Sequence, residues 1–241
     1  MRSVYEHIIA SIKSKHKLLA VLIDPDKIDI NAVEAFINKV NASIATHVFV
    51  GGSKVEPSIT QTLVIEIKKY TSIPIVLFPG DVTQITTEAD AILFLALLSG
   101  RNPEYLIGKH VEAVPELMST NLEVIPTAYL LIENGKMTSV EKVTNTKPLS
   151  RTDIKTAMHT ALAGEYLGMK MTYLEAGSGA SMPVPIGMIK EIKTALNGPL
   201  IVGGGISDKT QLQNAYDAGA DMVVIGTALE RDETFFNDLK R

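Results

Sequence analysis

The segment "PLIVGGG", residues 199–205, is the clearest sign of the fold, because a short apolar run leads directly into three glycines. Similar apolar runs recur along the chain, at residues 18–24, 47–52, 73–80, 91–98, 122–132, 171–177 and 221–227. Uninterrupted runs of this length are typical of parallel strands that are buried on both faces. Eight of them with helix-like segments between predict an α/β fold of the (β/α)8, or TIM-barrel, type, with an open doubly wound sheet as the alternative.

Two connections depart from the repeating pattern. Residues 80–90 are too few for a normal helix with its two loops. We therefore expect the helix after the third strand to be reduced to a short connection, which is either a single helical turn or a gap that leaves a groove beside strands three and four. Residues 133–153 contain the turn signal Asn134–Gly135 and predict a hairpin or another excursion. The length of 241 residues suits one barrel, so we expect a single domain over residues 1–241.

Composition limits the possible functions. The net charge is -4 and no long basic tract occurs, which argues against nucleic acid as a partner. The chain has no cysteine, so disulfides and thiolate metal sites are excluded. The most apolar stretch, residues 91–98, is too short to span a bilayer. The N-terminal segment lacks the apolar core of a signal peptide, and we expect a cytoplasmic protein.

Glycine-rich turns follow the last three predicted strands, at residues 177–179, 203–205 and 226. Such turns allow backbone N–H groups to approach an anion closely, and the helices that follow them favour negative charge. The loops after strands seven and eight are a frequent phosphate site in this fold. The segments "VGGGIS" and "VIGTAL" therefore predict a phosphate site together, although each glycine could also serve only a tight turn.

Four polar side chains stand at predicted strand ends. Glu175 could accept a hydrogen bond from a ligand hydroxyl or act as a general base, or it could cap a helix or pair with a lysine. Tyr173 lies on the same face of its strand and could donate to a phosphate or belong to the core. Asp24 and Ser53 follow adjacent strands and could share a magnesium ion, which needs few protein ligands. Their alternatives are an ordinary turn residue and a helix cap. Lys27, three positions after Asp24, resembles a solvated turn residue.

Several motifs in this order resemble the geranylgeranylglyceryl phosphate synthase family over nearly the whole chain. They are "LIDPDK" (22–27), "VGGS" (50–53), "SGRNPEYLIG" (99–108), "TAYLLIENG" (127–135), "YLEAGSGA" (173–180), "VGGGI" (202–206) and "IGTA" (225–228). The related bacterial heptaprenylglyceryl phosphate synthases share part of this pattern. The middle section is more similar to the archaeal-type branch, which favours a geranylgeranyl substrate over a heptaprenyl one.

The resemblance implies a modified TIM barrel and a prenyltransferase of ether lipid biosynthesis. The reaction would join the C3 hydroxyl of sn-glycerol 1-phosphate to a polyprenyl diphosphate and release diphosphate with Mg²⁺. By the same resemblance, Glu175 is the catalytic base and the magnesium ligands are Asp24 and Ser53. The residues that would bind glycerol 1-phosphate are Tyr173, Leu174, Glu175, Ala176, Gly177, Ser178, Gly179, Gly203, Gly204, Gly226 and Thr227.

The resemblance also implies a groove for the apolar tail and a homo-oligomer, either a dimer or a hexamer. Candidate groove residues are Phe78, Phe94, Leu95, Leu98 and Tyr105, although ordinary core is the commoner role for any one of them. Transient membrane contact is expected because a prenyl substrate partitions into lipid. Two alternatives remain: a sugar-phosphate isomerase or aldolase, for which Lys27 or Lys54 could form a Schiff base, and a non-catalytic phosphate-binding protein.

Overall fold

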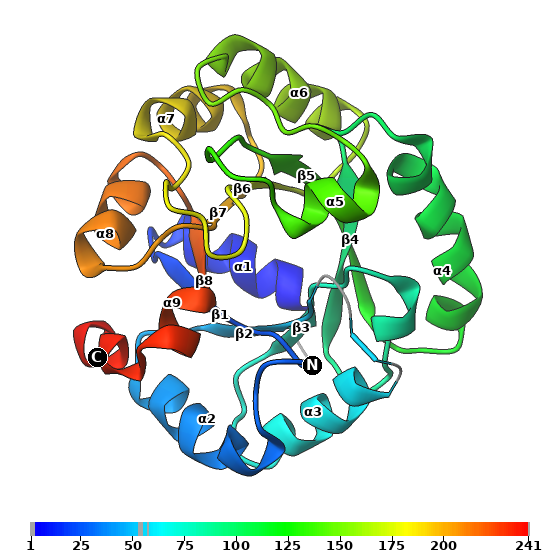
Figure 1. Cartoon of the computed structure of the whole chain (residues 1–241), viewed down its shortest axis with the longest axis vertical. Coiled ribbons are helices and arrows are strands. Elements are labelled where there is room, and N and C mark those ends of the chain that lie inside the picture. The colour runs from blue at the N-terminus through cyan, green and yellow to red at the C-terminus, as the bar shows by residue number, and fades with distance from the viewer. Residues whose placement is uncertain (1–2, 53–54, 57, 241) are drawn as a thin grey trace.

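The computed structural model describes residues 3–52, 55–56 and 58–240, in which eight parallel strands close into a barrel (Figure 1). Each strand pairs with its successor in the chain, and β8 pairs back with β1. The strands are β1 (Leu18–Ile23), β2 (His47–Val50), β3 (Ile75–Leu77), β4 (Ala91–Leu97), β5 (Glu123–Leu131), β6 (Met171–Glu175), β7 (Leu200–Gly203) and β8 (Met222–Ile225). Each lies within one of the predicted apolar runs, so the (β/α)8 prediction is confirmed.

Helices surround the barrel (Figure 1). The α-helices are α1 (Val4–Lys13), α2 (Val33–Ala42), α3 (Ile59–Lys68), α4 (Lys109–Met118), α5 (Ser139–Thr144), α6 (Ile154–Tyr166), α7 (Ile186–Ala195), α8 (Lys209–Asp217) and α9 (Thr227–Arg231). Shorter or irregular helices are η1 (Ile30–Ala32), η2 (Val82–Gln84), the π-helix η3 (Glu104–Gly108) and η4 (Glu233–Leu239). None of the described helices is long and apolar enough to cross a membrane.

Alternate strand residues face opposite sides of the sheet, and this produces two apolar layers. In β1, Leu18 and Ala20 belong to the barrel interior, whereas Leu19 and Val21 pack in the layer between strands and helices. Helix α1 closes the N-terminal end of the barrel, because its Val4 and Ile8 pack into the interior cluster. The opposite end, where the strands terminate, stays open for the loops that carry polar side chains.

The connection between β3 and β4 contains only the 3-10 turn η2 among the described elements. Asp81 caps this turn by accepting a hydrogen bond from the N–H of Thr83 at 3.2 Å. The buried side chain of Gln84 hydrogen-bonds both backbone groups of Gly52, receiving its N–H at 3.2 Å and donating to its carbonyl at 2.7 Å. The predicted reduction of this helix is confirmed, and η2 also holds the loop after β2.

Residues 133–153 form an excursion with a short helix, not a hairpin. Of the two predicted forms the structure has the excursion, because the bridge that joins Ile132 to Leu149 is parallel. Helix α5 begins at a capping box in which the Thr138 hydroxyl and the Glu141 carboxylate each bond the other's backbone N–H. The pattern "TSVE" (138–141) is the sequence signal for such a cap. The excursion lays α5 across the open end of the barrel (Figure 1).

His47 makes the stability of the barrel sensitive to acid. It is fully buried near His7, and burial followed by repulsion from His7 lowers its pKa to about 3. Because the folded pKa lies below the unfolded value of about 6.5, stability is complete above that value and falls as pH drops below it. We expect His47 to cost about 2 kcal/mol of unfolding free energy between pH 7 and pH 5. Denaturant unfolding at both pH values should show a smaller loss for His47→Gln than for the wild type.

The exposed His16 provides the matched control. His16→Gln should retain the acid sensitivity of the wild type, since it leaves the buried His47 in place. Equal pH slopes for the two variants would contradict the assignment of this sensitivity to His47.

Candidate active site

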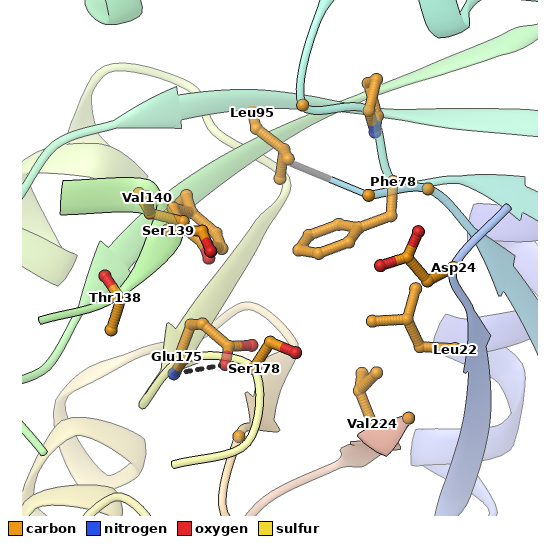
Figure 2. Close-up of a pocket in the computed structure, with 18 of the residues that line it drawn as sticks. Leu22, Asp24, Phe78, Leu95, Thr138, Ser139, Val140, Glu175, Ser178 and Val224 are labelled. Atoms are coloured by element: carbon orange, nitrogen blue, oxygen red, sulfur yellow. Dashed lines mark hydrogen bonds between the residues drawn. The ribbon is translucent and has the colours of Figure 1, made fainter. Parts of the chain in front are cut away.

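A cavity of about 550 Å³ opens at the C-terminal ends of the strands. Its polar part is formed by the loops after β1, β6, β7 and β8, and its apolar part by β4, α4 and α5. The carboxylates of Asp24 and Glu175 point into it from opposite walls, with the Phe78 ring on the wall between them (Figure 2). One cavity therefore combines a polar pocket with an apolar arm.

Glu175, the last residue of β6, is the buried acid of this cavity. Its side chain is only 6% exposed, and its Oε1 accepts a 2.6 Å hydrogen bond from the N–H of Gly177 (Figure 2). Burial raises the pKa of Glu175 to about 7, although interactions with the Tyr173 hydroxyl and the Gly177 N–H oppose the rise. Gly204, with φ +81°, leaves room for this carboxylate, because a Cβ there would clash with Oε1. A carboxylate with this pKa is suited to general base catalysis near neutral pH.

The loops after β6 and β7 expose unpaired backbone donors. Within the described part of the chain, the N–H groups of Ser178, Gly179, Gly204 and Gly205 donate to no protein acceptor. A hydrogen bond of 3.0 Å between the hydroxyls of Ser178 and Thr227 joins the first loop to the loop after β8. Converging N–H groups of this kind can hold an anion. Helix α9, which follows the loop after β8, has only five residues and therefore a weak dipole. The backbone N–H groups would contribute more to anion binding than this helix dipole.

Arg231 adds a positive charge that the sequence analysis did not identify. It lines the cavity from α9, and its guanidinium lies so close to Gly179 that a Cβ there would be 3.1 Å from Nη2. Arg231 follows Thr227 by four residues and therefore lies on the same helical face. The four-residue spacing between Thr227 and Arg231 was the signal in the sequence that could have identified Arg231. The guanidinium adds a positive charge beside the loop after β6, and arginine matches the geometry of a phosphate group well.

The predicted glycerol phosphate residues do not all face this space. Those that line the cavity are Tyr173, Glu175, Gly177, Ser178, Gly179, Gly204, Gly226 and Thr227. Leu174 and Ala176 are fully buried in the layer between strands and helices, so their side chains point away from the cavity. Gly203 lies beneath it, against the Tyr173 hydroxyl and the Glu175 carboxylate. Tyr173 itself is a buried core aromatic, and its hydroxyl lies beside the Glu175 carboxylate without a hydrogen bond of regular geometry to any described residue.

The predicted magnesium site is only half described, because Ser53 lies outside the described residues. Asp24 lines the cavity after β1, and a Cβ on Gly52 would come within 2.5 Å of its Oδ1. The carboxylate thus rests against a backbone that Gln84 holds in place. No group of three or more His, Cys, Asp or Glu residues that could bind a metal occurs in the described ranges. A single carboxylate still suits Mg²⁺, which often binds through one or two carboxylates and substrate phosphates.

Lys27, which resembled a solvated turn residue in the sequence, is part of an ion-pair network. Its Nζ lies 2.9 Å from Asp24 Oδ2 and 3.2 Å from Glu230 Oε2. Burial tends to lower the pKa of Lys27, but the two carboxylates outweigh burial and raise it. The side chain lines the cavity in its ammonium form.

The apolar arm lies where the ring of helices lacks a member, beside β4 and η2. Four of the five predicted tail residues line it, namely Phe78, Phe94, Leu95 and Tyr105. Leu98 does not line it and packs instead in the layer between strands and helices, near Gly164 of α6. Additional lining that the sequence analysis did not identify comes from His110, whose ring meets Phe94 edge-on at 4.4 Å, and from Val140 of α5.

These features define a (β/α)8 barrel with an anion pocket, a buried acid and an apolar arm. The chain belongs to the PcrB family, whose model matches residues 11–240. It is similar to a geranylgeranylglyceryl phosphate synthase of Flavobacterium johnsoniae, at 52% identity over 98% of each chain. The synthase of the same name from Thermococcus gammatolerans is 42% identical over 90% of this chain and 86% of its own.

Solved structures show the same relationship. The crystal structure of (S)-3-O-geranylgeranylglyceryl phosphate synthase from Thermoplasma acidophilum, in complex with its substrate sn-glycerol-1-phosphate, superposes with a TM-score of 0.93. It is 32% identical and matches 99% of this chain and 96% of its own. A thiamine phosphate pyrophosphorylase from Pyrococcus furiosus, at 16% identity and a TM-score of 0.56, shares the fold alone.

The burial of Glu175 should cost the protein stability at alkaline pH. Its folded pKa of about 7 exceeds the unfolded value, so stability is complete below the unfolded pKa and decreases as pH rises through 7. We expect the ionised form to cost about 3 kcal/mol at pH 8. Glu175→Gln should raise the unfolding free energy relative to wild type at pH 8, with a much smaller gain at pH 5. Equal differences at both pH values in denaturant unfolding would contradict this reading.

Proposed function

We propose that the chain transfers a geranylgeranyl group from geranylgeranyl diphosphate to the C3 hydroxyl of sn-glycerol 1-phosphate, releasing diphosphate. The observation that carries the proposal is the position of Glu175, which lies between the anion pocket and the apolar arm of one cavity. The family membership and the names of the relatives support the same activity. A ligand with a phosphate at one end and a hydroxyl at the other would place the hydroxyl beside this carboxylate.

The glycerol phosphate would be held at its non-reacting end. Its phosphate would accept hydrogen bonds from the free N–H groups of Gly179 and Gly204 and pair with Arg231. Anchoring of this kind aligns a hydroxyl without taking part in the chemistry. When the C3 oxygen forms its bond to C1 of the prenyl chain, its proton passes to the Glu175 carboxylate.

The bond from C1 of the prenyl chain to diphosphate breaks in the same reaction, and its electron pair leaves with the diphosphate oxygen. Asp24 is the described residue that would hold Mg²⁺, with Ser53 as the second expected ligand. When bound, Mg²⁺ supplies neutralisation of the charge on the leaving diphosphate. The rings of Phe78 and Tyr129 lie beside the reacting region and can attract positive charge that develops on the allylic carbon.

A sugar-phosphate isomerase or aldolase would use the same anion pocket but has no need of the apolar arm. A Schiff-base lysine must reach its unprotonated form, whereas Lys27 is paired with two carboxylates that favour the ammonium. A heptaprenyl-specific member of the family would require a longer tail site, and the chain length is the part of the proposal that an assay must decide. The homo-oligomer and transient membrane contact are further proposals that rest on the family resemblance, and the cytoplasmic location also stays a proposal.

A direct transfer assay tests the proposal. Labelled sn-glycerol 1-phosphate, Mg²⁺ and polyprenyl diphosphates of several lengths should give an organic-extractable product, with geranylgeranyl diphosphate the best donor. The sn-3 enantiomer is the substrate control, and omission of Mg²⁺ tests the metal. Glu175→Ala should lower the rate by roughly 10²- to 10⁴-fold. Folded protein that binds glycerol phosphate but transfers no prenyl chain would overturn the proposal.

The pH profile provides a separate check of the base. Since burial raises the pKa of Glu175 to about 7, kcat/KM should fall tenfold per pH unit below about pH 7. The residual activity of Glu175→Gln should lack this limb. An acidic limb that persists in Glu175→Gln would assign it to another group.

A further inference from the structure

Lys27 joins two carboxylates that belong to opposite ends of the chain. It follows β1, where its N–H donates to the carbonyl of Asp24 at 3.0 Å, and its ammonium reaches Asp24 and Glu230 at 2.9 and 3.2 Å. All three residues line the cavity. Their position in a substrate cavity, rather than on the outer surface of the barrel, points to a functional charge.

The balance of charge in this network changes with occupancy. Two carboxylates and one ammonium carry a net negative charge, which would repel a diphosphate. If Asp24 held a divalent cation, the Lys27 ammonium would be repelled from that carboxylate, and Glu230 would remain as its partner. The ammonium has three donors on a flexible stem, so one can stay with Glu230 while the others face the cavity.

Helix α9 connects this network to the anion pocket. Glu230 holds Lys27 on one side of the helix, and the next residue, Arg231, lies against Gly179 on the other. One short helix therefore positions both cationic groups. Arg231 lies at the loop after β6, and Lys27 lies at the end of β1. Two anionic groups, the glycerol phosphate and the diphosphate, need two such positions.

From this geometry we propose that Lys27 binds the diphosphate of the prenyl donor and stabilises it as it leaves, with Glu230 as the positioning residue that holds Lys27 once Asp24 is occupied. Lys27 keeps its proton throughout and acts only as a hydrogen-bond donor. The electron pair of the broken bond stays on the diphosphate oxygen that faces the ammonium. This inference rests on the proposed prenyl transfer, because it names the residue that receives the leaving group.

Binding measurements without turnover test the inference. Inorganic diphosphate is titrated into the protein in the presence of excess Mg²⁺, and Mn²⁺ alone is titrated separately, both by calorimetry. Lys27→Met should weaken diphosphate binding about tenfold, since a charge-assisted hydrogen bond is lost. The same variant should bind Mn²⁺ several-fold more tightly, because Asp24 loses a competing cation. Lys27→Arg should retain most of the diphosphate affinity.

Glu230→Gln should weaken Mn²⁺ binding, because Lys27 then rests on Asp24 alone. The matched control is Lys39→Met, since Lys39 also pairs with a carboxylate of the C-terminal segment, Glu233, and has the same 46% side-chain exposure. Lys39 lies outside the cavity, so this variant should change neither affinity.

Opposite changes in the two affinities for Lys27→Met separate a binding role from a structural one. A structural role would weaken both ligands together, and that outcome overturns the inference, as does a wild type that binds no diphosphate. The KM for the prenyl diphosphate should rise in Lys27→Met while the KM for glycerol phosphate stays unchanged. Prenyl transfer by the wild type with unaltered diphosphate binding in Lys27→Met would refute the inference and leave the proposed function intact.

Discussion

The pairing of β8 with β1 is the constraint on which the site depends. It joins Leu18–Val21 to Met222–Ile225 in parallel register and closes the barrel. Without that seam, the loops after the first and last strands would lie at opposite edges of an open sheet. Closure brings Lys27 and Glu230 into contact although 203 positions separate them in the chain. It also gives all strand ends one common mouth, so that an acid, an anion pocket and a candidate metal ligand face the same space.

Much of the fold could be predicted from the sequence, because the relevant signals are local. A strand buried on both faces must be apolar at every position, as "PLIVGGG" (199–205) is, and this pattern is visible in a short window. The missing helix after β3 follows from the length of its connection alone. The unpaired backbone N–H groups after β6 and β7 were also predictable, since exposed donors of this kind need glycine and the fold fixes which strands lead into such loops.

The remaining features depend on distant contacts that no local pattern reports. Leu98 was expected in the tail groove, but β4 ends at Leu97 and the next side chain turns toward Gly164 of α6. The two hydrogen bonds between Gln84 and Gly52 join the connections after β3 and β2. No local sequence pattern in either connection predicts these bonds. Lys27 resembled a solvated turn residue because its partner Glu230 lies near the other end of the chain. Such ion pairs and side-chain to backbone hydrogen bonds join distant parts of the chain. They can be assigned only once the closed barrel is known.

The burial of Glu175 connects the stability of the barrel with its chemistry. The floor beneath this carboxylate is aromatic, with Tyr173 packed against Phe78 at 5.3 Å and Tyr129 at 5.4 Å between ring centres. The acid thus rests on an apolar floor and faces the cavity, and a prenyl tail in the apolar arm would displace water from beside it. The same exclusion that destabilises the ionised carboxylate strengthens its interaction with a hydroxyl and denies water access to a cationic carbon. A barrel that buried this acid less deeply would be more stable in alkali but would expose the allylic carbon to hydrolysis.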